Sequence, residues 1–174
     1  RIKELYGCTG RPNEGLRIDP VEQAKRIREA EQNDPLLRGR VIHGVADPAI
    51  FDESRGESIA AMMERSPHFL RWQPGDHTRL AGKMQFHYRL HFDEEGRPML
   101  QVFHTCKHFI RTIPNLVYDE SNVEDIDTRQ EDHIYDECRY VLMENPLSPP
   151  RTEPVQPMPD DPLELGKKAR FFRV

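Results

Sequence analysis

The spacing of apolar residues near the N-terminus predicts a helix. The residues recur three positions apart and share one face, with charged residues opposite: Val21, Ala24 and Ile27. Asp19 followed by Pro20 is typical of a helix start, and Glu22 completes a capping box. The segment 33–35, Asn-Asp-Pro, ends the helix.

A second pattern predicts a strand and a short helix. Residues 40–47, RVIHGVAD, are largely apolar and β-branched, which favours a central strand buried on both faces. Pro48 cannot continue an interior ladder, so Asp47 is expected at the C-terminal tip of this strand. Residues 57–65 predict a short helix with three inward side chains: Ile59, Met62 and Met63.

Alternation of apolar and polar positions over residues 84–106 predicts a β-hairpin. The apolar members of the first strand are Phe86, Tyr88, Leu90 and Phe92. The DEEGR segment is interpreted as the turn and MLQVFHTC as the returning strand. A short helix is expected over residues 107–113, where Pro114 stops it.

The C-terminal third predicts one helix followed by a tail. Residues 128–131, TRQE, read as a capping box. A helical stripe then continues toward Pro146 through Ile134, Cys138, Val141 and Leu142. Seven prolines between residues 146 and 162 favour a linker, and the chain ends in a basic-aromatic stretch that is either a docking segment or a ragged end. We therefore expect one α/β domain over 1–146, with a mixed sheet flanked by helices and an added hairpin, and a tail over 147–174.

Composition narrows the class of protein. The 174 residues are 36% hydrophobic and 32% charged, so part of the chain is expected to be extended. The net charge of −5 argues against a strong stand-alone nucleic-acid binder, although it allows an enzyme that meets DNA through a local basic patch. Three widely spaced cysteines without a CxxC pair argue against a zinc site or disulfide framework and favour a reducing, cytoplasmic setting.

The sequence also lacks several common signatures. No apolar run reaches the ~18 residues of a membrane helix. The first residues, RIKELYG, are neither a signal peptide nor a Met start, so we expect a fragment of a longer protein. Nucleotide-binding glycine motifs and the GxSxG motif of serine hydrolases are also missing from the sequence.

Acidic residues are the main candidates for chemistry. Nine carboxylates lie between Asp119 and Glu137. Asp132 and Asp136 are spaced i, i+4 on the final predicted helix, and Asp47 ends the predicted strand, where ligands collect in α/β sheets. If the fold brings these carboxylates together, their mutual repulsion invites a hard divalent cation such as Mg²⁺.

Each acidic residue also has a purely structural interpretation. Asp47 before a proline is often a turn former, and Asp132 in a first helical turn complements the helix dipole. Asp136 can pair with Arg139 or with a lysine elsewhere. The segment 119–127 reads as a solvated loop.

Four sequence blocks resemble the C-terminal nuclease domain of the large terminase subunit of tailed bacteriophages and prophages. In order they are GVADPAIFD (44–52), GDHTRLAGKMQFHYRL (75–90), LQVFHTCKHFIRTIPNLVYD (100–119) and EDIDTRQEDHIYDECRYVLM (124–143). The resemblance runs over residues 1–146. It implies an RNase H-like fold and an endonuclease that cuts concatemeric viral double-stranded DNA during packaging in the host cytoplasm.

The resemblance also implies residue roles. Asp47 and Asp132 match family acids that hold two divalent ions, Mg²⁺ or Mn²⁺, and Asp136 is a neighbouring ligand. The family's first acid precedes the strand matching RIKELYG, so we expect this fragment to lack that first strand, to bind metal weakly and to cleave poorly. The implied partners are DNA, the ATPase domain of the same protein, the portal and the small terminase subunit.

The implied reaction is two-metal phosphodiester hydrolysis, in which one ion activates water and the other stabilises the leaving oxygen. Four basic residues are predicted to contact DNA phosphates without reading bases: Arg79, Lys83, Lys107 and Arg111. Two alternatives remain open. One is a non-catalytic RNase H-like module that docks onto the packaging motor or portal, and the other is a resolvase or exonuclease on the same fold.

Overall fold

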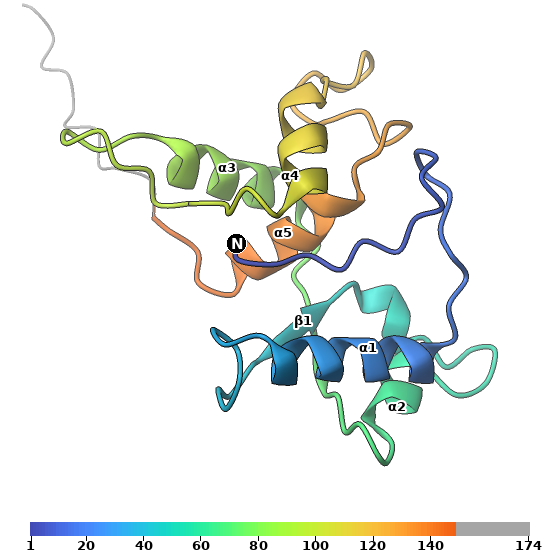
Figure 1. Ribbon diagram of the computed structural model, residues 1–174. Coiled ribbons are helices and arrows are strands. Elements are labelled where there is room, and N and C mark those ends of the chain that lie inside the picture. The colour runs from blue at the N-terminus through green and yellow to red at the C-terminus, as the bar shows by residue number, and fades with distance from the viewer. Residues whose placement is uncertain (149–174) are drawn as a thin grey trace, which may run out of the picture.

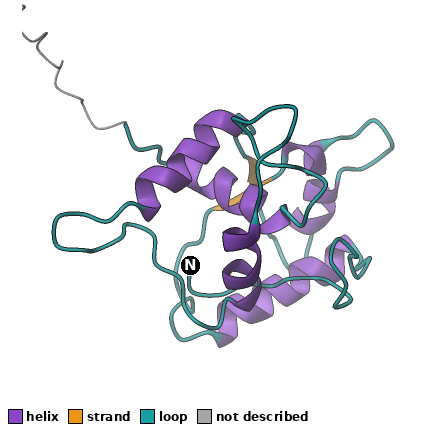
Figure 2. Cartoon of the chain, turned by 90° about the horizontal axis from the view of Figure 1, so that it is seen from above, coloured by secondary structure: helices purple, strands orange, loops and turns teal. Residues whose placement is uncertain are grey.

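The computed structural model describes residues 1–148, and nearly all of the predicted tail lies outside the described residues. The described chain is mixed α/β, with five α-helices and a two-stranded parallel sheet (Figures 1 and 2). Its elements are α1 (Pro20–Asn33), β1 (Gly44–Ala46), η1 (Pro48–Phe51), α2 (Ile59–Glu64), β2 (Trp72–Pro74), α3 (Arg79–Leu90), α4 (Lys107–Thr112), η2 (Ile113–Asn115) and α5 (His133–Met143). No helix within residues 1–148 is long and apolar enough to cross a membrane.

Helix α1 forms as the sequence predicts. The Asp19 carboxylate accepts hydrogen bonds from the Val21 and Glu22 amides at 2.8 and 3.4 Å, which satisfies two N–H groups of the first turn. Ala24 is fully buried in a small cluster with Met63 and Leu70, whereas Val21 is 40% exposed. The predicted inward face is therefore confirmed at its centre and wrong at its first residue.

The predicted strand over 40–47 is shorter and less buried than expected. Strand β1 contains only residues 44–46, all half-buried, and Val41 is 86% exposed. It pairs in parallel with β2, with Gly44 opposite Trp72. A Cβ atom at Gly44 would lie 2.7 Å from the Trp72 ring, so the close approach of these strands requires glycine. Because the described sheet has two strands, β1 is not a central strand, and residues 1–7 form no strand.

The short helix α2 confirms the prediction for residues 57–65 with one exception. Ser58 precedes it and accepts a hydrogen bond from the Ala61 amide at 3.3 Å. Met63 is buried and Met62 half-buried, as predicted, but Ile59 is 41% exposed and Ala60 is buried in its place.

The predicted β-hairpin over 84–106 is wrong, because its first half is helix α3. The buried residues of α3 are spaced three and four apart, at Gly82, Gln85 and Phe86. Leu90 and Phe92, which alternation placed inward, are 42% and 62% exposed. The DEEGR turn does form, with Gly96 at φ +75°. Of the hairpin, the structure keeps the bridge between Phe92 and Pro98 and a hydrogen bond of 2.9 Å from the Leu100 amide to the Arg89 carbonyl.

Helices α4 and α5 complete the described chain. Helix α4 ends just before Pro114, as predicted. The capping box at 128–131 is wrong: α5 begins at His133, Thr128 is exposed, and the Glu131 carboxylate bonds to Tyr6 and Arg111 instead. The apolar stripe of α5 is confirmed except at Val141, which is 52% exposed.

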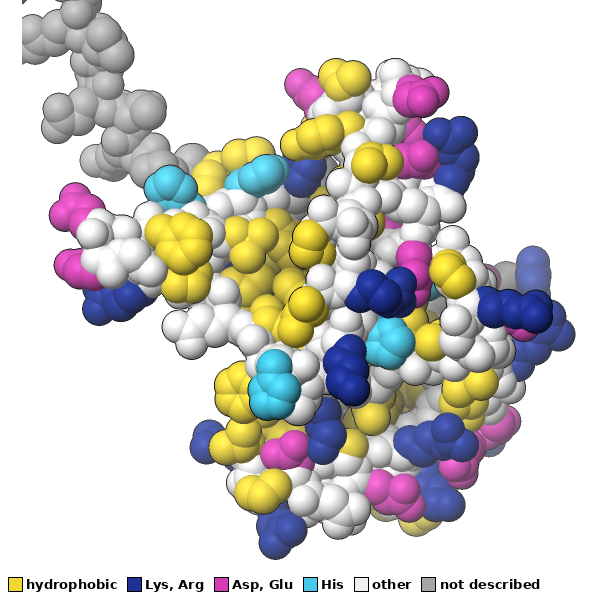
Figure 3. Space-filling model, turned by 45° about the horizontal axis from the view of Figure 1, so that its top comes forward, with side chains coloured by type: hydrophobic (Ala, Val, Ile, Leu, Met, Phe, Trp, Pro, Cys, Tyr) yellow, Lys and Arg dark blue, Asp and Glu magenta, His cyan; other side chains and the backbone are white. Residues whose placement is uncertain are grey.

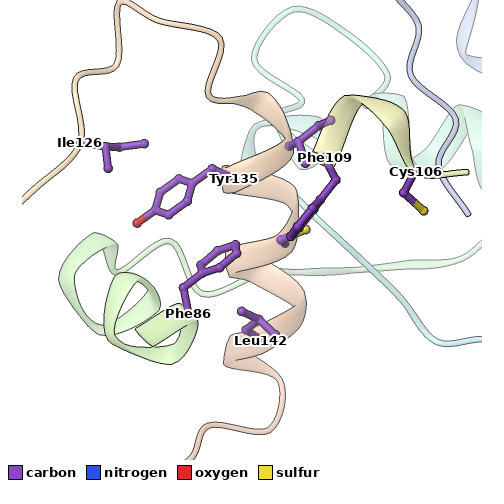
Figure 4. Packing of buried hydrophobic residues seen from close by; sticks show 8 residues of the cluster. Phe86, Cys106, Phe109, Ile126, Tyr135 and Leu142 are labelled. Carbon is purple, nitrogen blue, oxygen red and sulfur yellow. The ribbon is translucent and has the colours of Figure 1, made fainter. Parts of the chain in front are cut away.

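The main core lies where α3 and α4 pack against α5 (Figure 4). The Phe86 and Tyr135 rings stack with centroids 5.0 Å apart. Its buried members are Phe86, Cys106, Phe109, Ile126, Ile134, Tyr135, Cys138 and Leu142. Figure 1 shows β1 between this upper group of helices and the lower pair α1 and α2, so the C-terminal tip of β1 meets α5.

Candidate active site

Asp47 follows β1 and joins the strand tip to α5. One carboxylate oxygen accepts the Ala49 amide at 2.7 Å, which starts the 3-10 turn η1. The other oxygen accepts the Tyr140 hydroxyl of α5 at 2.7 Å. Burial and this hydrogen bond raise the pKa of Tyr140 to about 12. Asp47 itself is exposed, so its carboxylate is anchored by its neighbours and still open to solvent.

Asp136 lies one helical turn before Tyr140 and is held by two arginines. The Arg139 guanidinium donates to its Oδ1 at 2.8 Å, and the Arg79 Nη1 atom lies 3.7 Å from the same oxygen. Arg139 is 2% exposed. The predicted alternative, pairing with Arg139, is therefore present, and it places two positive charges next to a candidate ligand.

Asp132 is buried and differs from the other two carboxylates. It precedes the first residue of α5 and makes no side-chain cap hydrogen bond. Apart from its own backbone amide, no donor of residues 1–148 bonds to its carboxylate, although His133 and Arg79 act on it through their charges. Burial, together with the negative charge of Asp136, raises the pKa of Asp132. A buried carboxylate with so little compensation is costly to keep ionised.

Two of the three acids face one groove. Asp47 and Asp136 both line a hollow of about 890 Å³, with Tyr140 between them on α5. Its apolar wall contains Ile27, Leu70 and Trp72. Asp132 is not part of the lining. No three His, Cys, Asp or Glu side chains of residues 1–148 converge closely enough to hold a metal ion together.

The basic residues predicted to contact DNA are mostly engaged with acceptors of the chain itself. Arg79 pairs with Asp125, and Lys83 donates to the Glu124 carbonyl. Arg111 pairs with Glu131 through two hydrogen bonds of 2.7 Å. Only Lys107 of the four is exposed without such a bond from residues 1–148. DNA phosphates would therefore compete with Asp125, Glu131 and the Glu124 carbonyl for three of these four residues.

The acidic loop is also less solvated than predicted. Asp125 is buried, and Ile126 beside it belongs to the main core. Burial acts to raise the pKa of Asp125, but hydrogen bonds from Arg79 and from the Ile126 amide outweigh it, and the pKa is lowered. The rest of the segment 119–127 is half-buried or exposed, as a solvated loop requires.

Sequence reasoning named Arg139 as a partner of Asp136 but missed Tyr140 and the packing of Arg139 against Gly82. The spacing of Asp132, Asp136 and Tyr140, four residues each, puts all three on one face of a helix, which was the available signal. Arg139 carried no such signal. Its side chain fills the space beside Gly82, where an added Cβ atom would lie 2.0 Å from the Arg139 Cγ atom.

Comparison of the chain with protein-family models, with curated proteins and with solved structures finds no match.

Proposed function

We propose that this chain is the metal-dependent endonuclease part of a viral DNA-packaging enzyme, acting on concatemeric double-stranded DNA. The four blocks that resemble the nuclease domain of the large terminase subunit support this proposal. The observation that carries it is the groove, where Asp47 after β1 and Asp136 on α5 face the same space. In an RNase H-like fold, the parallel strands β1 and β2, which end beside α5, would bring Asp47 and Asp136 to the same groove.

The donor chemistry of the groove suits a hard divalent cation. Asp47 and Asp136 offer carboxylate oxygens, the ligands that Mg²⁺ and Mn²⁺ prefer, and Asp132 lies one turn from Asp136. When bound, such ions would lower the pKa of water and stabilise the leaving oxygen of a phosphodiester.

The residues around the carboxylates would orient them and balance their charge. Tyr140 fixes the Asp47 carboxylate through its 2.7 Å hydrogen bond, as outer partners of metal ligands do. Arg79, at 3.7 Å, offsets the charge of Asp136, so an arriving cation competes with its guanidinium. Arg139 is buried and donates to Asp136 from the interior, so it does not occupy the solvent side of that carboxylate.

The same proposal includes the partners and the location. Double-stranded DNA would be the substrate, and an ATPase domain of the same protein, the portal and the small terminase subunit would be the neighbours. The cytoplasm of the bacterial host would be the compartment.

Conversion of supercoiled plasmid to nicked and linear forms in Mg²⁺ or Mn²⁺ tests the proposal. Asp47→Asn and Asp136→Asn are expected to lower the initial rate at least ~100-fold, since loss of a direct ligand costs no less than loss of an outer partner. Tyr140→Phe is expected to lower it ~10-fold, because Asp47 keeps its charge but loses its orientation.

Asp52→Asn is the matched control. Asp52 is exposed and lies outside the groove lining, and among residues 1–148 its carboxylate accepts hydrogen bonds from Ser54 alone. Its variant is expected to cut at the wild-type rate. Equal nicking by wild type and by Asp47→Asn would overturn the catalytic assignment and favour the non-catalytic docking module. Products from linear and closed circular DNA would separate an endonuclease from an exonuclease.

A further inference from the structure

A second hollow of the molecule is lined by basic residues that the proposed active site does not use. It has a volume of about 500 Å³ and lies between the C-terminal half of α1, the turn that follows it and the segment before β2. Its basic lining residues are Lys25, Arg28, Arg38, Arg40 and His68. Figure 3 shows Lys and Arg side chains interspersed with Asp and Glu side chains over the lower part of the molecule.

Arg28 forms a wall of this basic pocket and already bonds within the chain through all three of its guanidinium nitrogens. Its guanidinium donates to the His68 and Phe69 carbonyls at 2.8 and 2.6 Å and to Glu31 at 2.7 Å. These bonds tie α1 to the segment before β2. Because Glu31 is neutralised by this contact, it adds little negative potential to the pocket.

Arg38 and Arg40 are positioned differently. Each uses its Nε atom on a backbone carbonyl, Arg38 on Gln32 at 2.8 Å and Arg40 on Leu36 at 2.7 Å. No carboxylate of residues 1–148 lies within ion-pair distance of either guanidinium. The Nη groups are thus oriented by the fold and free to donate, which is the arrangement that binds phosphate in a bidentate manner.

The charge of the basic pocket is opposite to that of the whole chain. Four Lys and Arg side chains, with His68, face two acidic side chains, Glu29 and Glu31, whereas the whole chain has a net charge of −5. Lys25 contributes from α1, where its ammonium lies 3.6 Å from Glu22. A local positive site on an acidic protein attracts polyanions to one place and repels them elsewhere.

The basic pocket adjoins the acidic groove. Arg28, Glu31 and Leu37 line both hollows, so the two share a wall along α1 and the turn after it. A polyanion held by Arg38 and Arg40 would therefore lie next to the groove that contains Asp47.

We propose that Arg38 and Arg40, assisted by Lys25, form a phosphate-binding site for the backbone of double-stranded DNA. Unlike Arg79, Lys83 and Arg111, which bond to acceptors of the chain itself, Arg38 and Arg40 keep their Nη groups clear of carboxylates of residues 1–148. It binds through phosphate and therefore without base preference. The purpose of holding DNA beside the groove rests on the proposed nuclease function, but the binding itself does not.

Fluorescence anisotropy of a labelled 20-base-pair duplex, with the 174-residue chain in EDTA and over a series of salt concentrations, tests the site. Arg38→Ala/Arg40→Ala is expected to raise Kd at least ~10-fold and to lower the slope of log K against log salt by about 1.8, or ~0.9 for each lost phosphate contact. The matched control, Arg97→Ala/Arg129→Ala, removes two arginines that pair with nearby carboxylates and is expected to change Kd less than ~2-fold.

The conservative variant Arg38→Lys/Arg40→Lys distinguishes a loss of phosphate contacts from a loss of folding, and circular dichroism checks the folding of every variant. It keeps the charge and loses the bidentate geometry, so an intermediate Kd and a nearly wild-type salt slope are expected. Equal Kd values for Arg38→Ala/Arg40→Ala and the control, or no binding by wild type, would overturn the inference.

Failure of the two proposals can be told apart. Duplex binding that depends on Arg38 and Arg40, without any plasmid cleavage in Mg²⁺ or Mn²⁺, would reject the nuclease and leave the phosphate site standing. Plasmid cleavage that depends on Asp47, with wild-type binding by Arg38→Ala/Arg40→Ala, would reject the phosphate site alone.

Discussion

The three candidate aspartates of this protein lie in three different electrostatic environments. Asp47 is exposed and held by hydrogen bonds, Asp136 is neutralised by Arg79 and Arg139, and Asp132 is buried with little compensation. Glu131 is the clearest case of a stabilised carboxylate. Hydrogen bonds from Arg111 lower the pKa of Glu131 to about 2. Burial opposes this shift, and the hydrogen bond from Tyr6 adds to it.

The Glu131 contacts predict how stability depends on pH. Since the folded pKa is below the usual 4.5, the stabilisation is present above pH 4.5 and is lost as pH falls toward 2. Because Arg111 is half exposed, we expect a contribution of about 1–2 kcal/mol. Urea midpoints measured from pH 6 to pH 2.5 should fall more steeply for wild type than for Glu131→Gln. The exposed control Glu120→Gln should follow wild type, and parallel curves for wild type and Glu131→Gln would contradict the assignment.

At the scale of elements, local signals predicted helices better than strands. Asp19 predicted the start of α1 correctly, because an N-cap depends on hydrogen bonds to residues next to it in the sequence. Residues 84–90 satisfy period 2 through Phe86, Tyr88 and Leu90, yet they belong to helix α3, which Gly82 allows to approach Arg139 of α5. That approach depends on a residue 57 positions away, which no local pattern contains.

Gly82→Ala tests the contact between α3 and α5. Replacing an exposed helical glycine with alanine normally raises helix stability by ~1 kcal/mol. Here, however, the new Cβ atom would lie 2.0 Å from the Arg139 side chain. We expect the variant to lose about 1–3 kcal/mol of unfolding free energy in urea. Gly7→Ala, which meets no atom within 4 Å, should change it by less than ~0.5 kcal/mol. Equal or greater stability of Gly82→Ala would show that α3 does not pack this closely.

At the scale of the whole molecule, an acidic groove and a basic pocket share a wall along α1. The sequence pointed to Asp47 and Asp132 as the main acids and to Asp136 as their neighbour, through strand-end position and helical spacing, and the fold brings Asp47 and Asp136 to the groove. It could not predict that Asp132 would be left out of the lining, or that Arg79 would pair with Asp125, because both depend on tertiary packing. Arg38 and Arg40 belong to no sequence motif. The sequence could not single them out, because backbone carbonyls of the folded chain orient their guanidinium groups.

Direct binding of Mn²⁺, followed by loss of the free-ion signal in electron paramagnetic resonance, tests the central claim independently of cleavage. The account predicts saturable binding by the wild-type chain that weakens at least ~10-fold in Asp47→Asn and in Asp136→Asn, because each removes a hard oxygen ligand from the groove. Asp52→Asn should bind as wild type does. Absence of saturable binding, or binding that Asp47→Asn and Asp136→Asn leave unchanged, would contradict the account.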